Sequence, residues 1–153
     1  MVVTLFIYLL ALSCWLGGML FFTVFTAPAV FAVLPVVDAG KVVSTIFPRY
    51  YMLGYVAGTL TLILALYFAA IRTSRGWWMI VAAALLGAFV LTLYAGAVVR
   101  PRVNAIRAVS TDPHPDPAQK AEFDRLHRLS VILNGGVMIL NVVALIGSAA
   151  ALA

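Results

Sequence analysis

Residues 1–37 decide the fold, because this long stretch contains no charged residue: MVVTLFIYLLALSCWLGGMLFFTVFTAPAVFAVLPVV. A helix needs about 20 apolar residues to cross the ~30 Å hydrocarbon core of a bilayer. The stretch is longer than that, and it lacks the basic start and the short apolar core of a secretory signal peptide. We therefore predict a membrane-spanning helix at about residues 3–34.

Three further stretches carry no charge, namely 50–71, 76–99 and 129–153. In lipid the backbone must satisfy its own hydrogen bonds, so each uncharged stretch of this length is expected to be helical. The predicted fold is an all-α integral membrane four-helix bundle that forms a single transmembrane domain over residues 1–153. Besides the first span, the predicted spans are about 50–72, 77–104 and 117–152.

The composition excludes most other classes of protein. Apolar residues make up 65% of the chain and charged residues 10%, whereas soluble domains have about 45–50% and about 25%. Disordered chains are far less hydrophobic than this. The formal net charge is +5, but nucleic-acid binding needs a basic soluble face. We expect the lipid bilayer, and no nucleic acid, as the surroundings of this chain.

The basic residues predict the orientation of the bundle. Two of the ten, Arg72 and Arg75, lie on one side of the predicted membrane, and the other eight lie on the opposite side. Because Lys and Arg favour the cytoplasmic side, we predict a multi-pass protein of the cell membrane with both termini on the non-cytoplasmic side.

The link between the first two predicted spans has the pattern of a short helix. Asp38 suits an N-cap position, and Pro48 is expected to end the segment. Its apolar residues share one face at helical spacing, which predicts a short interfacial amphipathic helix. Those residues are Val42, Val43, Ile46 and Phe47.

The third link contains proline at alternate positions from Pro113 to Pro117. This predicts an extended loop, after which Asp116 and Pro117 suit the start of the fourth helix.

Polar residues in the spans predict a candidate binding site. His127, Asn134 and Asn141 recur at intervals of seven on the fourth helix, and Ser130 shares their face. Arg100 and Asn104 lie four apart at the same end of the bundle. An anionic ligand or an anionic lipid headgroup would suit such a site; snorkelling arginines and helix–helix hydrogen bonds are the alternative. The candidate binding residues are Arg49, Arg100, Arg102, Asn104, His127, Ser130 and Asn134.

Small residues at four-residue spacing predict close helix contacts, either within the chain or between copies. Such pairs include Gly54 with Gly58, Ser13 with Gly17, and Ala83 with Gly87. The candidate packing residues are Gly17, Gly54, Gly58 and Gly87, and we expect a homo-oligomer or a complex with other membrane subunits.

Catalytic patterns are missing from the sequence. No Asp or Glu lies within a predicted span core, and Cys14 is a lone cysteine. One of the two histidines lies in the proline-rich loop, so one chain cannot build a zinc site or a bis-histidine haem inside the membrane. The sequence therefore requires no cofactor or metal and predicts no enzyme.

Several segments resemble a known family in the right order along nearly the whole chain. The most specific are Phe47-Pro48-Arg49-Tyr50-Tyr51 and the His-x-x-Ser-x-x-x-Asn pattern from His127 to Asn134; Trp15 to Met19 and Arg100 to Arg102 add to them. The chain resembles the transmembrane-protein-205-like proteins, also called domain of unknown function 4149. The resemblance implies a four-helix membrane protein whose biochemical role is unsettled.

A more distant resemblance links the first span to copper-resistance D-type and haem-linked membrane proteins. Those proteins carry a histidine about seven residues before the tryptophan, where this chain has Tyr8.

Three functional hypotheses follow. The first is a packing or accessory subunit of a membrane complex or oligomer. The second is a small-molecule or metal-ion carrier that uses the polar stripe of the fourth helix. The third is a haem- or metal-binding redox protein with His127 as a ligand.

Overall fold

The computed structural model describes residues 1–109 and 116–153, and within them every regular element is a helix. The proline-rich loop that the sequence predicts lies mostly outside these residues. The elements are α1 (Val2–Phe21), η1 (Phe22–Thr26), α2 (Ala27–Val33), α3 (Val36–Ile71), α4 (Arg75–Tyr94), η2 (Ala95–Val99), α5 (Arg100–Val109) and α6 (Pro117–Leu152).

These elements join into four long rods, because η1 and η2 are single π-helical turns inside otherwise continuous helices. Each rod is long and apolar enough to cross a membrane. The prediction of an all-α four-helix membrane bundle is thus confirmed. The rods extend over Val2–Val33, Val36–Ile71, Arg75–Ile106 and Pro117–Leu152.

The predicted short interfacial helix is not present as a separate element. Its residues form the first turns of α3, which continues through Pro48 without a break. Proline removes one backbone donor but does not have to end a helix that is held by its surroundings. Here the hydroxyls of Ser44 and Thr45 donate to the Lys41 carbonyl, and the Phe47 and Tyr51 rings lie 6.0 Å apart across the proline.

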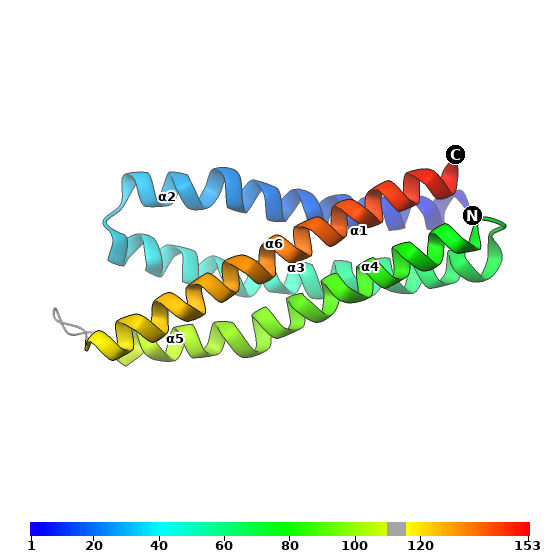
Figure 1. The fold of residues 1–153 in the computed structure, drawn as a ribbon. Coiled ribbons are helices and arrows are strands. Elements are labelled where there is room, and N and C mark those ends of the chain that lie inside the picture. The colour runs from blue at the N-terminus through cyan, green and yellow to red at the C-terminus, as the bar shows by residue number, and fades with distance from the viewer. Residues whose placement is uncertain (110–115) are drawn as a thin grey trace.

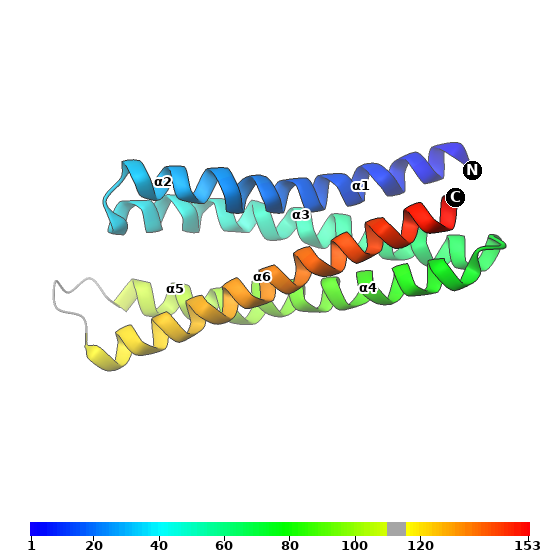
Figure 2. The ribbon, with the colours of Figure 1, turned by 45° about the horizontal axis from the view of Figure 1, so that its top comes forward.

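The rods follow one another around the bundle. α1 packs on α3, α3 on α4, and α4 on α6. Both termini lie at the end that also holds the α3–α4 turn, and the α2–α3 turn lies at the other end (Figure 1). α6 crosses the bundle diagonally, so it approaches α1 near the termini and diverges from α2 toward the opposite end (Figures 1 and 2).

Aromatic rings fill the core near the termini. Tyr8, Phe68 and Trp78 are fully buried. Their ring centroids lie 5.9 Å apart for Tyr8 and Phe68, 5.5 Å for Tyr8 and Trp78, and 4.7 Å for Phe68 and Trp78. This cluster joins α1, α3 and α4 at the end where the rods lie closest together.

Glycines allow the rods to approach at mid-bundle. A β-carbon on Gly58 would lie 2.6 Å from Cδ2 of Phe89 and 3.0 Å from Cη2 of Trp15, and one on Gly54 would lie 2.9 Å from Cγ2 of Thr92. A β-carbon on Gly87 would lie 3.2 Å from Cδ1 of Leu140 in α6. Gly17, by contrast, is exposed, with nothing within 4 Å of such a β-carbon.

Candidate functional site

The polar side chains of α6 form one stripe along the helix. With about 100° between successive residues, its members fall in an arc of about 60°. Their exposure decreases along the helix, from exposed His127 through half-buried Ser130 and Asn134 to fully buried Asn141 and Ser148. The stripe therefore enters the bundle from the end that is opposite to the termini.

Two tyrosines from distant parts of the chain form hydrogen bonds with this stripe. The Tyr50 hydroxyl of α3 donates to Oδ1 of Asn134 at 2.9 Å, and Nδ2 of Asn134 donates to the Ser130 carbonyl at 2.8 Å. Near the termini, the Tyr8 and Ser148 hydroxyls are 2.7 Å apart. The stripe thus ties α6 to α3 in one place and to α1 in another.

Asn141 lies between these two links and is only partly satisfied. Its Nδ2 donates to the Val137 carbonyl at 2.9 Å, whereas its buried Oδ1 has no hydrogen-bond partner in the described structure. Buried amide oxygens nearly always have a partner, so this atom is an open acceptor inside the bundle.

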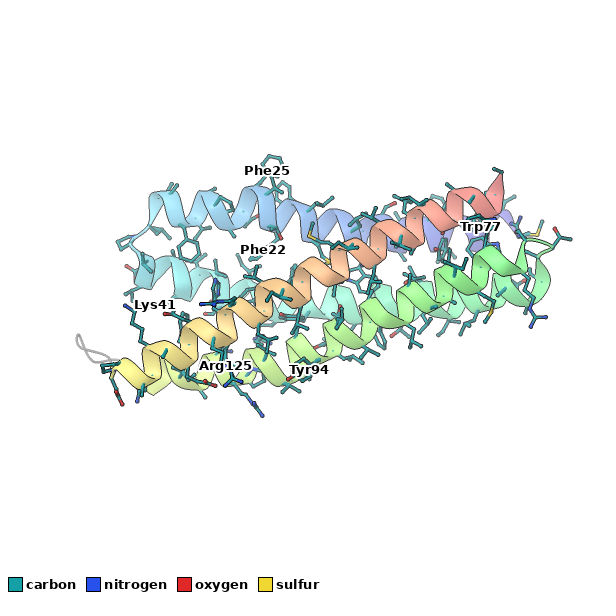
Figure 3. The ribbon with its side chains drawn as sticks, viewed as in Figure 1. Phe22, Phe25, Lys41, Trp77, Tyr94 and Arg125 are labelled. Carbon is teal, nitrogen blue, oxygen red and sulfur yellow. The ribbon has the colours of Figure 1, made fainter. Side chains whose placement is uncertain are left out.

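A small cleft adjoins the stripe where α1 and α6 diverge. Its free space is about 10 Å³, close to what a single water molecule needs. Phe22 points from η1 toward the bundle and Phe25 points away (Figure 3). The Phe22 ring lies 5.3 Å from that of Tyr50, which lines the cleft. Residues lining the cleft include Trp15, Met19, Tyr50, Gly54, Thr92 and Asn134.

A second group of polar side chains lies between α3 and the start of α5. A β-carbon on Gly96 would meet the Tyr55 hydroxyl and would lie 2.8 Å from the Tyr51 ring, so η2 lies directly against these tyrosines. Arg100 follows one turn later on the same side and acts electrostatically on Tyr55. Its Nε is buried and has no hydrogen-bond partner among the described residues.

The seven candidate binding residues therefore do not gather at one place. Tyr50, which faces α6, and Tyr55, which faces η2 and α5, lie about 140° apart around α3. His127, Ser130 and Asn134 belong to the first side, and Arg100 belongs to the second. Half-buried Asn104 follows Arg100 by one helical turn.

The two remaining arginines of the predicted site are exposed. Arg49 lies about 160° from Tyr51 around α3 and so faces away from η2 and α5. Arg102 is exposed on α5. Exposed His127 stacks on Phe123 with ring centroids 6.2 Å apart.

Charge pairing in the described structure is local and exposed. Lys41 Nζ lies 3.0 Å from Oδ1 of Asp38, and Arg125 Nη1 lies 3.7 Å from Oε2 of Glu122. Both pairs join neighbours on one helix, where such contacts stabilise little. Within the described residues, no group of three or more His, Cys, Asp or Glu side chains is placed to hold a metal ion.

Tyr8, Tyr50 and Tyr55 are the polar partners that sequence reasoning missed. The Tyr50-Tyr51 pair fits an interfacial aromatic belt, and nothing in the sequence distinguishes a tyrosine that donates across the bundle from one that faces lipid headgroups. The partners lie 84 residues apart for Tyr50 and Asn134 and 140 apart for Tyr8 and Ser148. The seven-residue period of the stripe was the available signal, and it indicated the face of α6 but not its partners.

Comparison with known proteins gives one match. The family model described as Domain of unknown function (DUF4149) matches residues 10–111. No curated protein and no solved structure matches the chain. The matched segment contains Trp15, Tyr50, Tyr55 and Arg100, and it ends before α6.

Proposed function

The chain belongs to the family Domain of unknown function (DUF4149), and from the shape of its bundle we propose that it acts as a packing or accessory subunit. It would be a subunit of an oligomer or of a larger complex in the cell membrane. The observation that carries the proposal is the α2–α3 tip, which we define as Phe31, Val33, Val36 and Val37. These side chains are 45%, 81%, 75% and 70% exposed.

The position of the α2–α3 tip makes this exposure informative. The tip lies at the same end of the molecule as the end of α5 and the start of α6 (Figures 1 and 2). Those segments carry Arg100, Arg102 and the charged residues from Lys120 to Arg128. Because charged side chains avoid the hydrocarbon core, this end of the bundle projects from it.

The length of α3 supports the same conclusion. Val36 precedes Arg49 by 13 residues, which is about 20 Å of helix. An apolar patch that far from a charged level is not covered by lipid chains, and exposed apolar patches outside lipid mark contact sites. A protein partner that covers the α2–α3 tip accounts for its composition.

Three finer assignments belong to the same proposal. We place the chain with the transmembrane-protein-205-like proteins, on the Phe-Pro-x-Tyr-Tyr and His-x-x-Ser-x-x-x-Asn patterns. We assign the end with the α2–α3 tip to the cytoplasm, which the excess of Lys and Arg near it supports. Exposed Gly17 on α1, four residues after exposed Ser13, offers a second close-packing face for a neighbouring subunit.

The test compares the mass of the native assembly with and without an altered tip. The chain alone has a mass of 16.4 kDa. We expect the full-length protein, extracted from its membrane into lipid nanodiscs, to run as a larger assembly. Val33→Lys with Val36→Lys should weaken that assembly by at least about tenfold, because an uncompensated charge in an apolar interface costs several kcal/mol.

Thr73→Lys is the matched control, because Thr73 is also exposed but lies in the turn at the other end. It should leave the assembly intact. A monomeric wild-type chain, or an assembly that survives both tip substitutions, would overturn the proposal. Mass spectrometry of the intact assembly then tells a second copy from a different subunit.

A further inference from the structure

The strongest unexplained feature of the molecule is the half-buried guanidinium of Arg100. Its Nε is buried and unpartnered within the described chain, and no ion pair reaches it there. A buried cationic donor without an acceptor is costly and is normally paired. The described part of the chain therefore supplies no hydrogen-bond acceptor for Nε of Arg100.

The neighbours of Arg100 bring further hydrogen-bond donors. The Tyr55 hydroxyl lies against Gly96, one turn before Arg100, and the half-buried Asn104 amide lies one turn along on the same face of α5. Guanidinium and phenol both donate hydrogen bonds, and the amide adds two more donors. Such a set suits an anion with several oxygens.

Gly96 makes this arrangement possible. Because it has no side chain, the rings of Tyr51 and Tyr55 lie directly against the backbone of η2, and a β-carbon would meet the Tyr55 hydroxyl. The hydroxyl is thereby held one helical turn from Arg100. The donors are thus positioned by two rigid helices and not by a loop.

The depth of Arg100 in the membrane indicates the source of the anion. The uncharged run 76–99 that precedes it is 24 residues long, or about 36 Å of helix. This slightly exceeds the ~30 Å hydrocarbon core, so Arg100 lies at the level of lipid phosphates. Among the described residues no carboxylate forms an ion pair with Arg100, and Asp38 and Glu122 pair with exposed neighbours on their own helices.

We propose that Arg100, Tyr55 and Asn104 bind the phosphate of an anionic phospholipid where α3 meets η2 and the start of α5. Arg100 donates to the phosphate oxygens through its guanidinium fork, in the paired geometry that arginine offers to phosphate. Tyr55 donates a further hydrogen bond from α3. The site is independent of the proposed subunit role, because it uses neither the α2–α3 tip nor the exposed face of α1.

The test is a lipid titration of the purified full-length chain in detergent, followed by native mass spectrometry. The probes are phosphatidylglycerol, phosphatidylcholine and inorganic phosphate. We expect Arg100→Gln to weaken binding of the first phosphatidylglycerol roughly tenfold, as expected for the loss of a charge-assisted contact. Tyr55→Phe should weaken it about threefold.

Arg102→Gln is the matched control, because Arg102 has the same charge two residues away but is exposed. It should change the affinity by less than about twofold. Equal losses for both arginine variants would show general charge attraction and would overturn the site. No loss for Arg100→Gln would overturn it as well.

Two further measurements examine the contact itself and the identity of the anion. Arg100→Lys keeps the charge but removes the paired donors of the guanidinium, so a folded Lys variant that binds as tightly as wild type would also contradict the proposed contact. If inorganic phosphate binds in an Arg100-dependent way and displaces the lipid, a soluble anion is the ligand, and the phospholipid assignment is overturned.

Discussion

Gly58 marks the place where α3 comes closest to its neighbours. A β-carbon there would lie 2.6 Å from Phe89 and 3.0 Å from Trp15, and the fully buried Trp15 ring has little room to move. We predict that Gly58→Ala lowers the free energy of unfolding by about 1–3 kcal/mol, the usual cost of overpacking. Thermal or SDS-induced unfolding of the purified protein in mild detergent measures this.

Gly76→Ala supplies the control for that measurement. Gly76 also lies in a helix, but nothing is within 4 Å of a β-carbon at this position. Alanine favours helix over glycine by up to about 1 kcal/mol, so this variant should be unchanged or slightly stabilised. Equal losses for the two variants would mean that helix contact at Gly58 is not the cause.

The Tyr50 hydroxyl carries a second prediction at the scale of single residues. It donates to Asn134 across the bundle, and Tyr50→Phe removes that bond while keeping the ring that packs on Phe22 and Phe47. We expect a loss of about 0.5–1.5 kcal/mol in the free energy of unfolding. A double-mutant cycle with Asn134→Ala measures the coupling, and additive losses would contradict a direct bond.

Among the elements, α3 is notable because it includes Pro48 without ending there. The proline leaves the Ser44 carbonyl without its usual intrahelical donor. We predict that Pro48→Ala keeps α3 continuous and raises the free energy of unfolding by about 1 kcal/mol or more, because the missing backbone bond is restored. Helical content by circular dichroism and the unfolding midpoint test this; a less stable Ala variant would show that the proline is needed at this point.

α6 shows how far an element can be predicted from its sequence. The spacing of His127, Asn134 and Asn141 correctly indicates one face of one helix. It cannot indicate what the face meets, because Tyr8 and Tyr50 belong to other helices and are separated from their partners by most of the chain. The period of a helix is a local property, whereas the rotation of one helix against another depends on packing of the whole bundle.

The same difference between local pattern and helix rotation decides which features of the whole molecule can be predicted from its sequence. Gaps between charged residues predict four spanning helices because lipid excludes charge along the entire length of each one. They also place Arg49, Arg100 and His127 at one end of the bundle. The gaps contain no information about rotation, and it is the rotation of α3, with Tyr50 on one side and Tyr55 on another, that divides the candidate residues between two places.

Orientation in the membrane is the prediction that belongs to the whole molecule. Both termini and the α3–α4 turn lie at one end (Figure 1), and eight of the ten basic residues belong to the segments at the other end or beside it. Moving such a basic end across the membrane is unfavourable, so the end with the termini should face outward. A single-cysteine experiment tests this, in a Cys14→Ser background that removes the native thiol.

Thr73→Cys lies at the end with the termini, and Lys120→Cys lies at the basic end; both positions are exposed. An impermeant maleimide should label Thr73→Cys in intact cells and Lys120→Cys only after the cells are permeabilised. The opposite pattern would reverse the orientation, and labelling of both sites in intact cells would show a mixed one. Arg72 and Arg75 flank the short α3–α4 turn, where basic residues oppose the predicted orientation most strongly, so replacing both with Gln should make the labelling difference larger and not smaller.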